Sequence, residues 1–349
     1  MTLKERTDAF VALGEKLNSI LKTDNTPQNS RIDKILINCY LNNKWFDEKH
    51  TKFALNHVVE MLSIENLNKW LAKSEQSLFS NNYPKRVGVV MAGNIPMVGF
   101  HDFLCILITG HIFIGKLSSQ DMILMPFIAD LLCEIDVRFK KYIFFKDDLR
   151  EGFDAVIATG STNTSRYFEY YFGKYPHIIR KNRNSIAVLS GNETIEQLDS
   201  LADDICLYFG KGCRSISKIY VPQNFNFENL IDALNKYKHF TDNSKYYNNY
   251  EYYKSIYIIN NLPYHDNGFI ILKEEEGFSS PVSVLFYEFY NDIINVNSVI
   301  AENLQHIQCV VSEIESVNNS IDFGKTQKPD LWDYADNVNT MDFLLKLNN

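Results

Sequence analysis

The sequence predicts an α/β protein of two units, and three observations carry that prediction. From about residue 85 onward, short β-branched runs alternate with helical stretches, a pattern typical of βαβ units and of a parallel, Rossmann-like sheet. A second series of strands and helices starts near residue 184. The chain has 349 residues and is 45% hydrophobic, which is enough to bury the cores of two domains, or of three if one is small.

The first unit is expected to open with helices and continue as an alternating sheet. Apolar residues recur at three- and four-residue spacing in residues 1–80, which predicts an N-terminal helical segment. Further helices are expected from about Pro96, over 121–135 and over 162–172. The expected strands are RVGVVMAG, HIFIGKL, KYIFFK, DAVIATG and PHIIRK. Ligands of such sheets bind at the carboxyl ends of the strands.

The second unit begins with the strand-like run SIAVLSG. Apolar residues on one face predict a helix over 194–209, and TIEQ at its start fits a capping box. The next run, SKIYVP, is expected to be a strand that ends at Pro222. Cys213 therefore falls in a tight helix-to-strand loop just after two glycines, Gly210 and Gly212, where a ligand can approach the backbone. The Tyr- and Asn-rich region 237–267 is poorly patterned and is expected to form loops and short elements.

Composition excludes several classes of protein. The net charge is −8 and the lysines and arginines are scattered, which argues against a nucleic-acid partner. Six cysteines lie far apart, with no CxxC pair and no Cys/His grouping, so neither a disulfide scaffold nor a metal site is expected. The N-terminus is charged and amphipathic, which predicts no secretion signal, and the run 103–114 is too short to span a membrane. A cytoplasmic location is expected.

Cys213, in FGKGCRSISK, has two interpretations. Lys211 and Arg214 flank it, and nearby cations stabilise the thiolate that acts as a nucleophile. Free cysteines are nevertheless more often inert core residues, and sequence neighbours need not point at the sulfur. From these residues alone the inert interpretation is favoured. The other five cysteines fall in apolar helical or strand-like runs and are expected to belong to the core.

Six separated segments together resemble the aldehyde dehydrogenase superfamily, and within it the LuxC-type acyl-CoA reductases. They are MAGNIP, GKLSS, ATGSTNTSR, GKGC, EEEGFSSPVSVLFYE and FGKTQKPDLWDYADNVNTMDFL. Each is a weak signal alone, but their shared order and spacing are specific, and the resemblance extends over nearly the whole chain from about residue 80. It implies an aldehyde-dehydrogenase-like fold, with a Rossmann-like cofactor domain and an α/β catalytic domain.

The resemblance also implies catalytic roles for two residues. Cys213 corresponds to the nucleophile of the family. Asn94 corresponds to an asparagine whose side-chain amide, with the Cys213 N–H, donates to a developing oxyanion. The alternative for Asn94 is a turn residue before Pro96, because asparagine favours turns.

Cofactor contacts are implied at four further residues. Lys116 ends a strand, where an ammonium can hold ribose or phosphate, although a strand-end lysine can also be simply solvated. Gly160 and Ser161 open a helix whose N–H groups can face a diphosphate, and Ser161 can also serve as an ordinary N-cap. Glu276 corresponds to a carboxylate that binds the nicotinamide ribose, but acidic runs are usually solvated loops and the match around EEEGF is ambiguous by one residue.

Two departures from the oxidising aldehyde dehydrogenases are informative. Those enzymes often carry a Glu that bonds the adenine ribose 2′-hydroxyl; here Ser119 stands in its place, which leaves room for the 2′-phosphate of NADP(H). Their water-activating Glu belongs to a segment that is HIIRKNRNS here, residues 177–185, without any carboxylate. Without a base to activate water, the acyl-enzyme is not rapidly hydrolysed and persists long enough to react with something other than water. This favours reductive chemistry.

The resulting hypothesis is an NADPH-dependent acyl-CoA reductase that reduces a long-chain acyl-CoA or acyl-carrier thioester to the aldehyde through a Cys213 acyl-enzyme. Alternatives are an NAD(P)-dependent aldehyde dehydrogenase that forms the acid, and an inactive subunit that binds nucleotide or acyl groups. An acyl-transferring partner protein is conceivable, and the oligomeric state stays open. The expected domains are a helical segment packing on the cofactor domain (1–80), an NADP-binding domain (81–183), a catalytic domain (184–322) and a tail returning to the cofactor domain (323–349).

Overall fold

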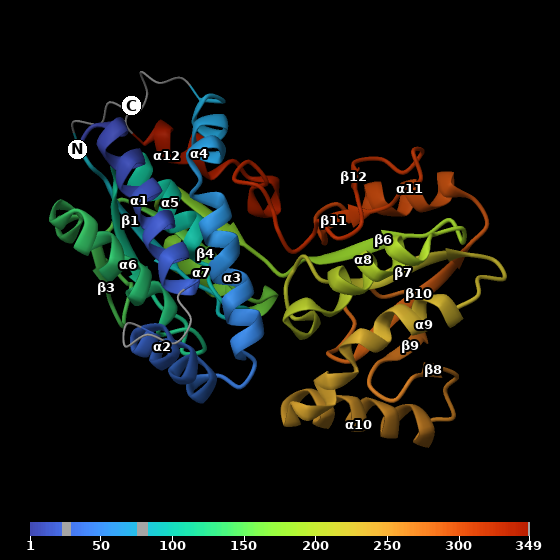
Figure 1. The fold of residues 1–349 in the computed structure, drawn as a ribbon. Coiled ribbons are helices and arrows are strands. Elements are labelled where there is room, and N and C mark those ends of the chain that lie inside the picture. The colour runs from blue at the N-terminus through green and yellow to red at the C-terminus, as the bar shows by residue number, and fades with distance from the viewer. Residues whose placement is uncertain (23–28, 75–82, 348–349) are drawn as a thin grey trace. The chain divides into compact units, whose positions relative to one another are not determined.

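A computed structural model describes residues 1–22, 29–74 and 83–347 of the chain, which forms two compact units (Figure 1). The first unit comprises Met1–Lys181 and Asp330–Asn349, and the second comprises Asn182–Pro329. The domain boundary expected at residue 80 lies outside the described residues. Each unit has its own sheet and its own buried core.

The first unit contains a five-stranded sheet of order β3-β2-β1-β4-β5, in which every pairing is parallel. Its strands are β1 (Arg86–Val90), β2 (Ile112–Lys116), β3 (Ile143–Phe145), β4 (Ala155–Thr159) and β5 (His177–Arg180). Most residues of β1, β2 and β4 are buried, as expected of central strands covered on both faces. All five strands expected from the alternating pattern are confirmed.

Helices precede these strands, connect them and follow them in the chain. They are α1 (Leu3–Lys22), α2 (Asn29–Asn42), α3 (Glu48–Met61), α4 (Ile64–Leu71), α5 (Phe100–Ile108), α6 (Leu124–Ile135), η2 (Val137–Lys141), α7 (Thr162–Phe172), η5 (Ala335–Asn337) and α12 (Thr340–Lys346). The helix expected from Pro96 begins only at Phe100, because Met97 has a φ of 66° and the chain turns there first. The helix expected over 162–172 has those bounds.

The C-terminal segment Asp330–Asn349 belongs to the first unit. The Trp70 indole donates a hydrogen bond to Tyr334 Oη at 2.8 Å, and His101 Nε2 lies 2.9 Å from the Leu331 carbonyl. Arg180, at the end of β5, is buried and donates to both carboxylate oxygens of Asp102 and to Thr340 Oγ1. A buried ion pair needs such additional partners to offset desolvation, so this network fixes the segment against α5 and β5.

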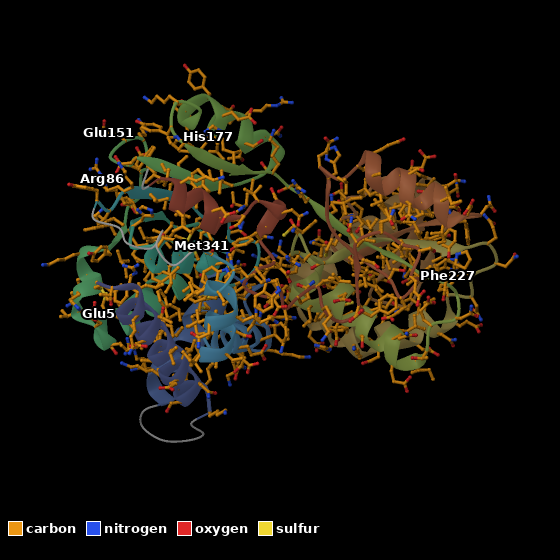
Figure 2. The ribbon with its side chains drawn as sticks, turned by 90° about the horizontal axis from the view of Figure 1, so that it is seen from above. Glu5, Arg86, Glu151, His177, Phe227 and Met341 are labelled. Carbon is orange, nitrogen blue, oxygen red and sulfur yellow. The ribbon has the colours of Figure 1, made fainter. Side chains whose placement is uncertain are left out.

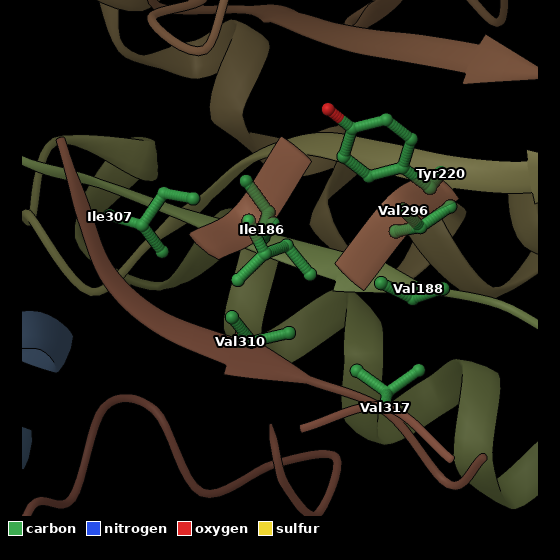
Figure 3. Packing of buried hydrophobic residues seen from close by; sticks show 8 residues of the cluster. Ile186, Val188, Tyr220, Val296, Ile307, Val310 and Val317 are labelled. Carbon is green, nitrogen blue, oxygen red and sulfur yellow. The ribbon is translucent and has the colours of Figure 1, made fainter. Parts of the chain in front are cut away.

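The second unit contains a seven-stranded sheet of order β12-β11-β6-β7-β10-β9-β8. Its strands are β6 (Asn184–Val188), β7 (Ile216–Pro222), β8 (His265–Asp266), β9 (Ile271–Glu274), β10 (Val284–Tyr290), β11 (Ile307–Val311) and β12 (Ser320–Ile321). All pairings are parallel except β8 with β9. On one face, Ile186, Val188, Tyr220, Val296 and Val310 form part of a buried apolar cluster (Figure 3).

The helices of the second unit are α8 (Ile195–Cys206), η3 (Leu207–Gly210), α9 (Glu228–Leu234), η4 (Asn235–Asp242), α10 (Ser244–Ile259) and α11 (Ile293–Glu302). The predicted capping box is confirmed: Thr194 and Gln197 bond each other's backbone N–H groups. Phe227, labelled in Figure 2, packs on Tyr287 of this unit with ring centroids 4.7 Å apart. Met341, also labelled there, lies on α12 of the first unit and is buried.

The expectation of loops over 237–267 is wrong, because most of that region is helical in η4 and the 16-residue α10. The Asn243 side chain caps α10 by accepting from the N–H groups of Lys245 and Tyr246. The helix buries Tyr246, Tyr250 and Tyr257 and exposes other tyrosines, so the buried and exposed faces look alike in sequence. A helix without contrast between its faces gives no periodic signal.

Candidate functional site

Cys213 lies in the loop between η3 and β7, as predicted. All six cysteines are within the described residues, and Cys213 is the exposed one. Burial raises the pKa of the Cys39 thiol to about 12 and that of Cys309 to about 11, so those thiols stay protonated at neutral pH. An accessible thiol in a loop is the arrangement that nucleophilic chemistry requires.

Four hydrogen bonds hold this loop in place. Ser185 Oγ, on β6, donates to the Cys213 carbonyl at 2.9 Å. The Gly212 N–H donates to Ser215 Oγ at 3.2 Å, and the Ser215 N–H donates back to the Gly212 carbonyl at 3.0 Å. Gln327 Nε2 donates to Ser215 Oγ at 3.3 Å. The backbone on both sides of the nucleophile is therefore fixed by neighbouring elements.

The segment that leads into the loop has an unusual backbone. Tyr208 and Phe209 have φ values of 56° and 57°, and both side chains are buried. Non-glycine residues rarely adopt this left-handed conformation, at a cost of about 1–3 kcal/mol each, and such strain tends to occur at functional sites. The Phe209 ring packs on Phe240, with centroids 4.3 Å apart, and that contact helps to hold the conformation.

A buried carboxylate supports the loop from α8. Asp204 accepts hydrogen bonds from the Gly324 N–H at 2.6 Å, from the Thr326 N–H at 3.1 Å and from Thr326 Oγ1 at 2.7 Å. Burial raises the pKa of Asp204 to about 6. Gln327, which bonds the loop through Ser215, also donates to the Asp204 carbonyl at 3.2 Å. The segment 324–327 thereby links α8 to the nucleophile loop.

Glu276 lies in the same unit as Cys213, in the connection between β9 and β10. Its side chain is exposed, and its backbone carbonyl accepts a hydrogen bond from the buried Lys218 Nζ at 2.7 Å. Cys213 and Glu276 are thus the two predicted site residues that the second unit contains.

The other predicted residues share the carboxyl edge of the first sheet. From β1 the strand order runs through β2 to β3 on one side, and β4 and β5 lie on the other side of β1. The point where the strand order reverses therefore lies between the ends of β1 and β4. Asn94 follows β1, and Gly160 and Ser161 follow β4. Ligands of open parallel sheets bind at such switch points. The edge therefore fits a dinucleotide.

Ser161 is the N-cap of α7 and accepts from the Thr164 N–H at 3.2 Å, which confirms the N-cap interpretation. The Gly160 N–H donates to the Arg180 carbonyl at 3.3 Å and so takes part in the sheet. The N–H groups that begin a helix have no intrahelical acceptor, so the start of α7 presents donors at this edge. A diphosphate at this edge would accept hydrogen bonds from the first N–H groups of α7, because the Gly160 N–H is already used in the sheet.

Lys116 ends β2, and Ser119 lines a pocket of about 500 Å³ beside it. The pocket is lined by Leu117, Ser119, Met122, Phe145, Lys146, Asp147 and Asp148. The Asp148 carboxylate pairs with Arg150 Nε at 2.8 Å. The lining combines apolar side chains with a hydroxyl and groups of both charges. Such a mixture suits the ribose of an adenosine.

Sequence reasoning missed Asp121, which is buried behind this edge. Its carboxylate accepts from the Met97 N–H at 3.1 Å and from the Leu124 N–H at 3.4 Å, so it joins the segment after β1 to the start of α6. Burial raises the pKa of Asp121 to about 6. Its place just before an apolar helix is a signal of capping that could have identified it.

His177, His239 and His265 are exposed. The first two lie within hydrogen-bonding distance of nearby backbone carbonyls, and the His265 ring packs on Phe227 with centroids 4.7 Å apart. Within the residues that the structure describes, no group of three or more His, Cys, Asp or Glu side chains could hold a metal ion. Over the same residues, no helix combines the length and the apolar character needed to cross a bilayer.

Comparison with known proteins places these observations in a family. A family model described as acyl-CoA reductase (LuxC) matches residues 24–253. The long-chain acyl-protein thioester reductase of Photorhabdus laumondii is 25% identical over 203 residues, which are 51% of this chain and 41% of that protein. The Aliivibrio fischeri protein of the same description is 27% identical over 192 residues, 49% of this chain and 39% of that protein. The matches span only about two fifths of the relatives' own length.

Solved structures give the fold. The aldehyde dehydrogenase KauB from Pseudomonas aeruginosa superposes with a TM-score of 0.64 at 11% identity, over 91% of this chain and 78% of that chain. An indole-3-acetaldehyde dehydrogenase in complex with NAD+ superposes with a TM-score of 0.63 at 13% identity, over 92% and 74% of the two chains. The predicted aldehyde-dehydrogenase-like α/β fold is confirmed.

Proposed function

The chain belongs to the acyl-CoA reductase (LuxC) family, and from that premise we propose that it reduces a long-chain acyl thioester, on CoA or on a carrier protein, to the aldehyde. The observation that carries the proposal is the Cys213 loop, which presents an exposed thiol on a backbone held by hydrogen bonds from Ser185 and Gln327 and within the loop itself. The two curated relatives described above are named as thioester reductases, which supports the class of substrate.

In the proposed reaction the Cys213 thiolate attacks the thioester carbonyl. The Cys213 N–H donates to the oxyanion, and the C–S bond to the carrier breaks to release its thiol. The family resemblance implies the same donor role for the Asn94 amide. The acyl group remains on Cys213 as a thioester. A bound NADPH supplies the hydride that reduces this thioester. The resulting thiohemiacetal on Cys213 loses its proton, expels the thiolate and leaves as free aldehyde.

The residues at the carboxyl edge of the first sheet would hold NADPH. Lys116 and Ser119 would contact the adenine ribose, and the start of α7 after Gly160 and Ser161 would receive the diphosphate. Lys146, in the pocket beside Ser119, supplies a cation suited to a 2′-phosphate. In the second unit, Glu276 would accept hydrogen bonds from the nicotinamide ribose.

Reduction, in preference to hydrolysis, is favoured by the segment 177–185. It contains no Asp or Glu, and its Arg180 is buried in an ion pair with Asp102. With no carboxylate in that segment to activate water, the acyl-enzyme persists until it is reduced.

The test is to mix the purified chain with NADPH and acyl-CoA esters of increasing chain length, or with acyl-carrier protein, and to follow the absorbance of the reduced cofactor. The proposal predicts oxidation of NADPH with one aldehyde formed per NADPH, and its loss in Cys213→Ala. No oxidation at any chain length contradicts it. Formation of free acid from aldehyde and NADP+, without the reductive reaction, would identify an aldehyde dehydrogenase instead.

A further inference from the structure

Lys218 is a fully buried ammonium on β7, the strand that begins just after the nucleophile loop. Its Nζ donates to the Glu276 carbonyl at 2.7 Å and to the Glu288 carboxylate at 2.5 Å. The rings of Tyr220 and Phe278 lie 4.8 and 5.2 Å from it. Because burial of an ammonium costs several kcal/mol unless it is paired and hydrogen-bonded, a site this complete indicates that the cation has a specific task.

The geometry of the sheet explains these contacts. Lys218 pairs with Phe286 of β10, so Glu288, two residues further along, lies on the same face. β9 and β10 are parallel neighbours, so the connection 275–283 between them has to run back across a face of the sheet. Lys218 holds this connection through the carbonyl of Glu276, the second residue of the connection.

Ser217 supplies a second anchor. The register between β6 and β7 shifts here, since Ser185 pairs with Ile216 and Ile186 pairs with Lys218, which leaves Ser217 as the extra residue of a bulge. Bulges redirect side chains and recur beside functional sites. Ser217 Oγ donates to the Phe278 carbonyl at 2.6 Å. Two consecutive residues of β7 therefore hold carbonyls two residues apart on the connection.

The far end of the same connection packs beside the nucleophile loop. Residues 280–284 line a small cavity of about 20 Å³, together with Gly210 and Ile216, which stand on either side of Cys213. The Glu276 side chain remains exposed. The backbone of the connection is thus fixed, while its carboxylate is left available to a ligand.

We propose that Lys218, assisted by Ser217, is a positioning residue that holds Glu276 at a set place relative to the Cys213 loop, so that its carboxylate can bind the nicotinamide ribose. The inference rests on the proposed function for the identity of the ligand. The anchoring itself depends only on contacts within the second unit.

The test compares Lys218→Met and Ser217→Ala with wild type, and uses Lys236→Met as a matched control. Lys236 is also an ion-paired lysine of the second unit, bonded to Asp199 and Asp203. Hydrogen exchange of residues 275–280, the Kd for NADPH from nucleotide fluorescence, and the rate of Cys213 alkylation by iodoacetamide are measured. Ser217→Ala keeps the test valid should Lys218→Met not fold.

Faster exchange over 275–280 is expected in both variants, with a Kd for NADPH raised about tenfold in Lys218→Met and about threefold in Ser217→Ala, as loss of one charged or one neutral hydrogen bond implies. Cys213 alkylation should change by less than about threefold, and Lys236→Met should resemble wild type. Unchanged exchange in the folded variants overturns the anchoring. Faster exchange with an unchanged Kd overturns the cofactor role. A wild-type chain that binds NADPH but reduces no thioester contradicts the proposed function alone.

Discussion

Ser185 Oγ donates a hydrogen bond to the Cys213 carbonyl at 2.9 Å, and the same hydroxyl lies 2.9 Å from Cys309 Sγ. One side chain of β6 thus holds the nucleophile loop and contacts a second, half-buried thiol. The hydroxyl contributes position and no charge, so its removal should impair orientation more than binding.

Ser185→Ala should lower kcat for thioester reduction about three- to tenfold, because one neutral hydrogen bond contributes about 0.5–1.5 kcal/mol. The KM for the acyl thioester should change little. Steady-state kinetics measure both. Ser298→Ala, which removes a hydroxyl bonded to the Ile294 carbonyl on α11, is the matched control. Equal effects of the two substitutions would contradict a role in positioning Cys213.

Cofactor preference should depend on the opposite charges of Lys146 and Asp147 in the pocket beside Ser119. Lys146→Gln should weaken binding of NADPH about tenfold and leave NADH almost unchanged, because only NADPH carries the 2′-phosphate. Asp147→Asn should shift the preference toward NADPH, because it removes a negative charge that repels the 2′-phosphate. Calorimetry with 2′,5′-ADP and with ADP measures this without turnover. Parallel shifts in the two variants would count against the assignment.

Arg180 and Arg138 should differ sharply in their contributions to stability. Arg180→Ala leaves the Asp102 carboxylate buried without its ion-pair partner, which should lower the free energy of unfolding by about 3–5 kcal/mol. Arg138 is half-exposed and pairs with Glu5 and Asp136, so solvent screens its ion pairs and Arg138→Ala should change the free energy of unfolding far less. Urea denaturation compares the two, and similar losses would contradict this prediction.

Asp121 should make stability depend on pH. Its pKa is raised from 3.8 to about 6 by burial, so its stabilising contribution is full below pH 3.8 and is lost as the pH rises through 6. A shift of about two units corresponds to about 3 kcal/mol. Because Asn does not ionise, Asp121→Asn should gain about that much relative to wild type between pH 3.5 and 7. Urea titrations at several pH values test it, and parallel pH profiles would refute it.

The five strands of the first sheet, and β6 and β7 of the second, were predictable because β-branched runs such as RVGVV and HIIR stand out from helical neighbours. The loop position of Cys213 followed from the glycines beside it. Helix α10 was missed because its buried and exposed faces are both rich in tyrosine. The pairing of Lys218 with the Glu276 carbonyl was beyond reach, since it joins residues 58 positions apart through a bulge that no local pattern reveals.

The central claim is that Cys213 carries the acyl group, and intact-protein mass spectrometry after incubation with a long-chain acyl-CoA, without NADPH, tests it most directly. The expected result is a mass increase of one acyl group, located on Cys213 by peptide mapping, absent from Cys213→Ala and discharged when NADPH is added. Cys133→Ala, which removes a thiol of the first unit, should acylate like wild type. Acylation of Cys213→Ala to the same extent, or turnover in that variant, would contradict the claim.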